Sequence, residues 1–419
     1  MMKNTTLRAL TIAALSVVLL VGADRPRFLG PDGSGVSTEK GLPVTWSPTE
    51  NIVWKTALPG FGASSPITLG ERIFVTAYSG YGQGDEAGRP EDLRHHVVCL
   101  DRSTGKILWD KSTKAVMPEQ PYGGYVAMHG YASGTPASDG KAVYAFFGRS
   151  GVYAYSLAGE LLWHAEVGTQ THEWGSGTSP ILAGDLVIVN ASVESQAVVA
   201  LKKLSGEKAW QTEGIRESWS TPALLHLADG KQELVVSCNG KVLGLDPATG
   251  KQLWTCAGVP DYVCPAVLAH GDVAYVTGGR RAVTLAVRGG GQGDVTKSHK
   301  LWQIAKTSSV PTPLFEGGHL YWISAAGIAC CVKADTGEVV AEQRVSGLGT
   351  VYGSLLLADG KLYCASRQKG AVVLAAEGSL KELARNDLGD SSVFNATPVP
   401  CGNGRLLLRS DKFLYCIGK

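Results

Sequence analysis

A tryptophan recurs along this chain at intervals of 44–55 residues, and most copies end the same short sequence. The full form runs from Asp101 to Trp109 as Asp-Arg-Ser-Thr-Gly-Lys-Ile-Leu-Trp, and the stretch from Asp246 to Trp254 repeats six of those residues in register. The glycine supplies the positive φ that a tight hairpin needs, so each copy predicts a turn leading into a strand. A repeat of this length corresponds to one small antiparallel sheet. The repeat tryptophans are Trp54, Trp109, Trp163, Trp210, Trp254 and Trp302, and two weaker copies at 335–340 and 378–383 lack the tryptophan.

A second signature precedes each repeat: a small residue, usually Ser or Thr, followed by proline. Proline lacks the backbone N–H and is tolerated at the first residue of a strand, so we expect each pair to start an innermost strand. Eight starts predict an all-β fold, an eight-bladed β-propeller of four-stranded antiparallel blades over residues 51–419. Seven starts contain the proline: Ser65-Pro66, Thr135-Pro136, Ser179-Pro180, Thr221-Pro222, Cys264-Pro265, Thr312-Pro313 and Thr397-Pro398. Gly353-Ser354 marks the start of the seventh blade without the proline.

The two ends of the repeat array complement each other. The last copy, residues 396–418, contains three apolar strand patterns and no fourth. Residues 51–58, which include Trp54, form a fourth-strand pattern with no sheet of its own. We therefore predict that the N-terminal strand closes the last blade, which leaves no unpaired sheet edge and holds both termini.

The N-terminus has the organisation of a signal peptide. Lys3 and Arg8 precede an apolar stretch from Ala9 to Val21, and small residues place the cleavage after Ala23. A retained membrane anchor is the alternative, although the apolar stretch is short for a span. We expect residues 1–23 to be removed, 24–50 to form an N-terminal extension, and the protein to be periplasmic or secreted, because no lipid-acceptor cysteine follows. A net charge of +2 predicts no binding to nucleic acid.

The Asp-x-x-Thr-Gly-Lys-x-x-Trp repeat with Ser/Thr-Pro starts resembles the pyrroloquinoline-quinone (PQQ) type of propeller repeat over residues 51–419. The segment from Arg27 to Gly35 is similar to the leaders of exported propellers from planctomycete-type bacteria. The resemblance implies one of two functions. Quinoprotein alcohol dehydrogenases hold PQQ and calcium on the propeller axis, whereas the outer-membrane assembly lipoprotein binds a partner protein and no cofactor.

An enzyme of the first kind needs more than the repeat. Members of that family use a catalytic Asp, a calcium held by Glu and Asn, and a disulfide between adjacent cysteines on a loop. Cys330 and Cys331 are adjacent, but they lie in a strand pattern, where side chains alternate between faces. We therefore expect no catalytic residue, no metal and no cofactor, with PQQ and calcium in a PQQ-dependent oxidoreductase as the alternative.

Other reactive residues are interpreted as structural. We expect Cys99, Cys238, Cys330, Cys364 and Cys416 to be buried in strands, and Cys256 with Cys264 to be the pair best placed for a disulfide. His95, His96, His129 and His172 lack the spacing of a metal site and are interpreted as solvated loop residues. The glycine-rich segment 289–293 is interpreted as a flexible hairpin loop.

A binding function has a candidate surface. In a propeller, the loops from fourth to first strand share one face with the loops from second to third strand, and two insertions, 80–95 and 111–131, fall on that face. We expect this face to bind a protein, peptide or glycan as a non-catalytic scaffold, and the protein to be monomeric; the alternative is that the loop side chains only fill the channel and pack between blades. The residues expected to ring the channel mouth are Tyr131, Glu173, Trp174, Glu217, Trp219, Tyr262, Tyr352, Phe394 and Asn395.

Overall fold

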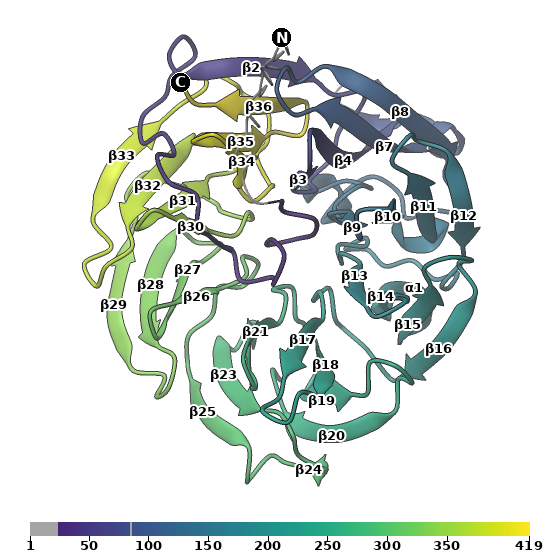
Figure 1. Cartoon of the computed structure of the whole chain (residues 1–419), viewed down its shortest axis with the longest axis vertical. Coiled ribbons are helices and arrows are strands. Elements are labelled where there is room, and N and C mark those ends of the chain that lie inside the picture. The colour runs from purple at the N-terminus through teal and green to yellow at the C-terminus, as the bar shows by residue number, and fades with distance from the viewer. Residues whose placement is uncertain (1–23, 84–85) are drawn as a thin grey trace, which may run out of the picture.

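Eight twisted sheets surround a central axis in the computed structural model, which describes residues 24–83 and 86–419 (Figure 1). The residues interpreted as a signal peptide lie outside that range. Each blade has four antiparallel strands that follow one another from the axis outward, and blades 4 and 7 each gain a fifth strand at an edge. The prediction of an all-β, eight-bladed propeller is confirmed. Within the described part of the chain, no helix has the length and apolar character that a bilayer crossing requires.

The first four blades are built in chain order, each from its innermost strand to its outermost. Blade 1 is β3 (Ile67–Leu69), β4 (Arg72–Ser79), β7 (Arg94–Asp101) and β8 (Ile107–Lys114); blade 2 is β9 (Ala137–Ser138), β10 (Ala142–Phe146), β11 (Val152–Ser156) and β12 (Leu161–Ala165); blade 3 is β13 (Ile181–Ala183), β14 (Leu186–Ala191), β15 (Ala197–Lys202) and β16 (Lys208–Glu213); blade 4 is β17 (Ala223–His226), β18 (Gln232–Cys238), β19 (Lys241–Leu245) and β20 (Gln252–Ala257).

The second half of the ring repeats this order. Blade 5 is β21 (Leu268–His270), β22 (Val273–Gly278), β23 (Val283–Arg288) and β25 (Lys300–Ile304); blade 6 is β26 (Leu314–Glu316), β27 (His319–Ile323), β28 (Ile328–Lys333) and β29 (Val339–Arg344); blade 7 is β30 (Leu356–Ala358), β31 (Lys361–Ala365), β32 (Ala371–Ala375) and β33 (Glu382–Asn386); blade 8 is β34 (Val399–Gly402), β35 (Arg405–Arg409), β36 (Phe413–Ile417) and β2 (Ile52–Ala57). The short helix α1 (Ser192–Ser195) follows the second strand of blade 3.

Blade 8 joins the two ends of the chain. Its outermost strand, β2, pairs antiparallel with β36, so that Trp54 faces Cys416 and Thr56 faces Leu414. Figure 1 shows the purple β2 beside the yellow β36. The predicted closure by the N-terminal strand is confirmed, and the propeller has no open edge between its first and last blades.

The repeat tryptophans lock neighbouring blades together. The indole N–H of Trp210 in blade 3 donates to the Pro247 carbonyl in the turn of blade 4, at 3.1 Å. The same ring covers Gly250, which has a φ of 72° and comes so close that a Cβ there would lie 2.4 Å from the indole. The turn therefore requires glycine for two reasons: the backbone is left-handed at this residue, and the tryptophan above it leaves no room for a Cβ. The same contact joins Trp54 to Gly105, Trp109 to Gly159, Trp163 to Gly206 and Trp302 to Gly337.

Trp254 has no such turn to cover, because blade 5 carries an insertion in its place. The fully buried Trp254 donates its indole N–H to Glu233 Oε2 at 2.7 Å, and the same oxygen accepts the N–H of Gly290 at 3.0 Å. The insertion continues as β24 (Gly293–Asp294), which pairs parallel with β20 at the outer edge of blade 4. Residues 289–293 lie in the hairpin connection between β23 and β25, as predicted, and the Glu233 contact and the pairing of β24 hold this connection against the neighbouring blade.

A second lock surrounds the axis. The N–H of Ser65 donates to the Thr135 hydroxyl of the next blade at 2.9 Å, and the pattern continues around the ring with donor–acceptor distances of 2.9–3.0 Å. The ring breaks only between blades 4 and 5, where Ala266 occupies the position and offers no hydroxyl. The start of blade 5 therefore lies two residues after the Cys264 at which the sequence places it. We call the seven hydroxyl residues the inner ring: Ser65, Thr135, Ser179, Thr221, Thr312, Ser354 and Thr397.

The extension of residues 24–50, hereafter the leader, is folded onto the propeller. It crosses the centre of the ring, where β1 (Val36–Ser37) pairs parallel with β30 (Figure 1). Farther along, Leu42 and Trp46 are buried in the core between blades 7 and 8. The leader is thus a structural part of the domain, and its β1 is the fifth strand of blade 7.

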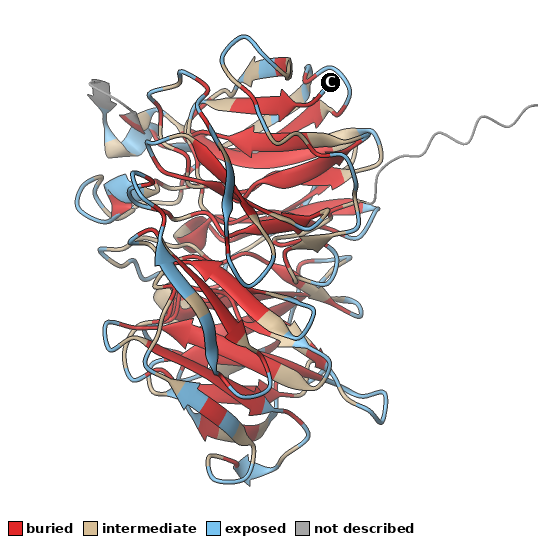
Figure 2. Ribbon diagram, turned by 90° about the vertical axis from the view of Figure 1, so that its left-hand side faces the viewer, coloured by how far each residue is buried: buried red, intermediate tan, exposed pale blue. Residues whose placement is uncertain are grey.

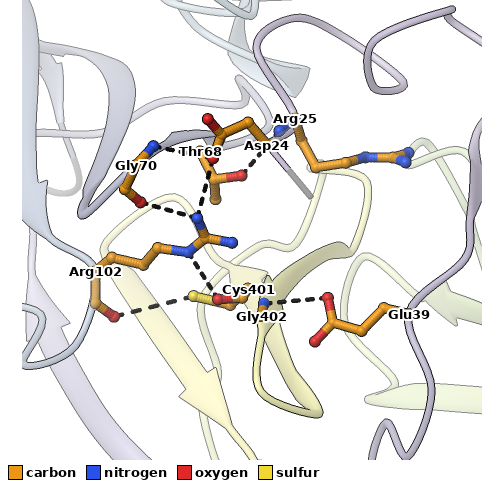
Figure 3. Close-up of polar contacts among 8 residues, drawn as sticks. All are labelled: Asp24, Arg25, Glu39, Thr68, Gly70, Arg102, Cys401 and Gly402. Atoms are coloured by element: carbon orange, nitrogen blue, oxygen red, sulfur yellow. Dashed lines mark hydrogen bonds and ion pairs between the residues drawn. The ribbon is translucent and has the colours of Figure 1, made fainter. Parts of the chain in front are cut away.

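The leader also bridges the seam between the first and last blades (Figure 3). Arg102, in the hairpin of blade 1, donates to the Cys401 carbonyl of blade 8 at 2.7 Å and to Asp24 of the leader at 3.2 Å. Glu39 accepts the N–H of Gly402 in blade 8 at 3.1 Å. The seam where the chain closes on itself is therefore held by three segments at once.

The second and third strands of the blades supply most of the core. Figure 2 shows buried residues concentrated in the middle strands, with exposed residues on loops and outer edges. The five cysteines predicted to be buried in strands are buried there. Cys330 and Cys331 point into the cores on opposite sides of blade 6, as strand alternation predicts. All nine cysteines are free, so the expected Cys256–Cys264 pair is wrong: Cys256 is buried in β20, whereas Cys264 faces the central channel.

Candidate functional site: an aromatic pocket at the channel mouth

A pocket of about 290 Å³ occupies one end of the central channel. Its lining has three levels. Aromatic side chains from the inter-blade loops form the rim, the inner ring forms the waist, and Phe28 of the leader contributes at the opposite side of the waist. The rim residues come from connections between a fourth strand and the next first strand, so the propeller geometry alone brings them to one circle.

Blades 2 to 5 supply an aromatic wall. The Trp174 ring lies 4.8 Å from Trp219 and 4.7 Å from Tyr262, and Tyr125 lies 4.9 Å away on its other side. The indole N–H of Trp219 donates to the Gly175 carbonyl at 2.8 Å, which fixes the ring. The wall is therefore preorganised, and it presents flat apolar surface to the cavity.

The opposite side of the rim is polar. The Arg367 guanidinium stacks on Tyr352 with 4.4 Å between the charge centre and the ring centroid, and it donates to the Met128 carbonyl at 3.0 Å. Asn395 donates to the same carbonyl at 2.8 Å. Its amide oxygen is buried and accepts no hydrogen bond from any described residue. Arg280 is exposed and lies beside Tyr262, at the end of the aromatic wall.

Five of the nine predicted mouth residues line the pocket: Trp174, Trp219, Tyr262, Tyr352 and Asn395. The other four lie elsewhere. Tyr131 packs edge-on against Tyr78 behind the rim, with 5.3 Å between ring centres, and Phe394 is buried in the core of blades 7 and 8. Glu173 and Glu217 lie outside the lining. The structure therefore separates an aromatic pocket from two carboxylates that the sequence grouped with it.

Sequence reasoning missed several lining residues. Tyr125, Met128 and His129 belong to the long connection between blades 1 and 2, whose path depends on tertiary packing. Arg280 lies in a short glycine-rich hairpin of blade 5, and Phe28 lies in the leader. For the first three, the unusual length of the connection was a usable signal; for Phe28, the sequence offers none that we can identify.

The two insertions pack against each other beside the pocket. The first forms a small hairpin of β5 (Tyr81–Gln83) and β6 (Glu86–Gly88), and the second contains the short 3-10 helix η2 (Val126–Met128). Tyr122 in the second insertion donates its N–H to the hydroxyl of Tyr81 at 3.0 Å, and its ring also contacts Tyr131. This tyrosine cluster supports the rim on the side of blades 1 and 2.

The interpretation of the histidines as solvated loop residues is wrong for His95 and His96, whereas His129 lies in a loop and is half-buried at the pocket. His95 and His96 lie inside β7 and are 1% and 6% exposed, because β4 and β7 extend farther than the apolar pattern indicates. Burial lowers the pKa of His95 to about 3, so this ring is neutral. His129 donates to the Trp174 carbonyl at 2.7 Å, and burial lowers its pKa as well. His172 lies in a loop, as expected, and contacts the Trp219 ring edge-on.

Ser79, His96 and Asp110 form a hydrogen-bonded relay across blade 1. His96 Nε2 lies 2.7 Å from the Ser79 hydroxyl, and Nδ1 lies 2.9 Å from the Asp110 carboxylate. The order of contacts is that of a hydrolytic triad, but the three residues lie on three adjacent strands and none of them lines the central pocket. We assign the relay to the cohesion of blade 1.

The lining residues do not suit a calcium-dependent quinone. Calcium takes carboxylate and carbonyl oxygens, and no Asp or Glu side chain lines the pocket within the described residues. Across residues 24–83 and 86–419, no group of three metal-ligating side chains comes together. We therefore derive no chemical step through PQQ or a metal for this chain.

These features define a class: an eight-bladed β-propeller with tryptophan-locked blades and an aromatic pocket on its axis. The family model described as outer membrane protein assembly factor BamB matches residues 30–171 and 93–257, which together span more than half of the chain. The chain belongs to this family of PQQ-like β-propellers. The sequence matches no curated protein.

Two solved structures share the fold. BamB from Moraxella catarrhalis superimposes with a TM-score of 0.61 at 14% identity, covering 87% of this chain and 96% of that chain. The computationally designed Ika8 protein gives 0.60 at 12% identity, covering 87% and 98%. Identities this low show a common fold, and the fold alone does not specify a ligand.

Proposed function

We propose that this chain is an exported, non-catalytic β-propeller that binds a segment of a partner protein at the mouth of its central channel. The observation that carries the proposal is the pocket of about 290 Å³ with its wall of Trp174, Trp219 and Tyr262. Aromatic residues in a preformed concavity are the usual anchors of protein and peptide recognition. The match to the BamB family model supports the same function, because that model describes an assembly factor.

The location of the protein forms part of the proposal. We place it in the periplasm or outside the cell, on the sequence pattern of residues 1–23. A glycan remains the alternative occupant of an aromatic wall, since sugars also stack on tryptophan faces. A PQQ-dependent oxidoreductase is the alternative in another class.

A peptide-display selection tests the binding function. A library would be selected on the wild-type protein, and the selected peptides measured against Trp174→Ala and against Leu204→Ala, in which a 95% exposed side chain in the turn of blade 3 is removed. We expect Trp174→Ala to weaken binding at least tenfold and Leu204→Ala to leave it unchanged. Failure to select any peptide that depends on Trp174 would refute the proposal.

The oxidoreductase alternative has its own measurement. PQQ with calcium would be added to the wild-type protein and the melting temperature recorded, because a ligand that binds only the folded state must raise it. We expect no shift at saturating ligand. A rise of several degrees, accompanied by dye-linked alcohol oxidation, would replace the binding proposal with an enzymatic one.

A further inference from the structure

The waist of the pocket carries hydroxyl groups whose protons have no acceptor among the described residues. Each of the seven inner-ring oxygens accepts one backbone N–H from the neighbouring blade. The ring residues are 2–6% exposed, and all seven line the pocket. Among the hydrogen bonds of the described residues, none has an inner-ring hydroxyl as its donor. A hydroxyl has one proton and two lone pairs, so each inner-ring oxygen that accepts a backbone N–H still has its proton to donate, and the waist offers a circle of donors to a ligand on the axis.

The charges around the pocket favour an anion. Arg280 is the charged side chain in the lining, and no carboxylate lines the pocket within the part of the chain that the structure describes. Asp261 lies outside the lining, where its carboxylate accepts the Arg280 backbone N–H at 3.0 Å. A carboxylate has about four acceptor positions and forms its strongest hydrogen bonds with several converging donors. A cationic group, by contrast, finds no carboxylate partner in this lining.

The aromatic wall lies directly above the ring of donors. Trp174, Trp219 and Tyr262 come from the loops that lead into blades 3, 4 and 5, and inner-ring residues Ser179 and Thr221 begin the first two of those blades. A ligand that places an anionic group at the waist therefore lays its next few atoms along flat apolar surface. This order, anion inside and apolar body outside, is that of a peptide ending in apolar residues.

The far end of the channel is occupied by the leader. Phe28 contributes to the pocket lining, and Arg27, Pro31 and Asp32 line a separate cavity among residues of blades 3 to 5. Figure 1 shows the leader crossing the centre of the ring. A chain that enters from the aromatic rim thus meets the leader, so the geometry favours a chain end over a segment threaded through the channel.

We propose that the pocket takes the free C-terminal carboxylate of the partner chain, with the carboxylate at the inner ring and the preceding apolar side chains against Trp174, Trp219 and Tyr262. This inference rests on the proposed function and specifies the part of the partner that is recognised. Arg280 at the rim attracts the carboxylate during approach, and the inner-ring hydroxyls donate to it once it is bound.

The test uses the peptides selected on the wild-type protein whose binding depends on Trp174. Each would be synthesised twice, with a free C-terminal carboxylate and with a C-terminal amide, and its dissociation constant measured by tryptophan fluorescence. We expect amidation to weaken binding at least tenfold. Equal affinity of the two forms would overturn the carboxylate assignment and leave the proposed function intact, whereas absence of any Trp174-dependent peptide would remove the proposed function itself.

Two neighbouring arginines provide a matched pair of variants. Both Arg280 and Arg281 are exposed, and only Arg280 lines the pocket. Arg280→Gln should weaken the free-acid peptide severalfold with little effect on the amide, and Arg281→Gln should match the wild type. Equal effects of the two substitutions would overturn the role of Arg280. An amidated peptide with an internal acidic residue that binds as tightly as the free acid would assign the pocket to an acidic side chain and refute a chain end.

Discussion

The tryptophan lock between blades makes a quantitative prediction at Gly250. A Cβ added at this residue would lie 2.4 Å from Cε3 of Trp210 and 2.8 Å from the Thr212 hydroxyl, and the residue has a φ of 72°. An L-residue in the left-handed region costs roughly 1–2 kcal/mol. Forcing a methyl group into a packed contact costs about 1–3 kcal/mol more. Gly250→Ala should therefore lower the free energy of unfolding by about 2–5 kcal/mol.

The control separates backbone strain from packing. Gly184 has a φ of 52°, and a Cβ there would meet no described atom within 4 Å, so Gly184→Ala incurs the backbone cost alone. Urea unfolding of both variants, followed by tryptophan fluorescence and circular dichroism, gives the comparison. We expect Gly250→Ala to be the less stable by at least about 1 kcal/mol, on the order of the packing cost. Equal destabilisation would show that the glycine is required only for its φ and that the tryptophan does not lock the blades.

Three further perturbations test other parts of the structure. Burial raises the pKa of Glu194 from 4.5 to about 7, so between these pH values the folded state keeps a proton that the unfolded state has released. The free energy of unfolding should therefore fall by roughly 3 kcal/mol as the pH rises from 4.5 to 7. Glu194→Gln should abolish that part of the pH dependence in thermal melts. Burial raises the pKa of the Cys264 thiol to about 12, so its alkylation rate should increase about tenfold per pH unit from pH 7 to 9. A bound peptide should slow this alkylation, because Cys264 lines the pocket. An alkylation rate that does not depend on pH would contradict the raised pKa. Arg102→Ala should lower the free energy of unfolding by at least about 2 kcal/mol, because it removes charge-assisted hydrogen bonds at the seam. Arg94→Ala, at an exposed residue of β7, should change the stability little in the same melts. Equal melting temperatures of the two variants would disprove the contribution of the seam.

The architecture was predictable because the repeat is local. The interval between tryptophans gave the size of a blade, and the lone strand at Trp54 with the three-stranded last copy gave the closure, which the pairing of Trp54 with Cys416 confirms. The same rule placed Trp174, Trp219 and Tyr262 at the mouth, since each lies just before an innermost strand. The length of the repeat and the position of each residue within it were enough to predict these features.

The remaining features depend on contacts between segments far apart in sequence. His95 and His96 were misread because nothing local showed that β4 and β7 pair over eight residues each. The parallel pairing of β24 with β20 requires a neighbouring blade as a template. Phe28 enters the pocket lining only because the leader crosses the ring. Tertiary packing decides each of these, and no periodicity in the chain indicates it.

Hydrogen–deuterium exchange on the wild-type protein, with and without a selected peptide, tests the central claim that the partner docks at the channel mouth. Ligand binding slows exchange where local opening is suppressed. We predict protection confined to the loops around residues 172–177, 217–221 and 261–264, with no change in the hairpins at 101–106 and 246–251. Protection of those hairpins, or of the outer strands, with the mouth unchanged would contradict the account.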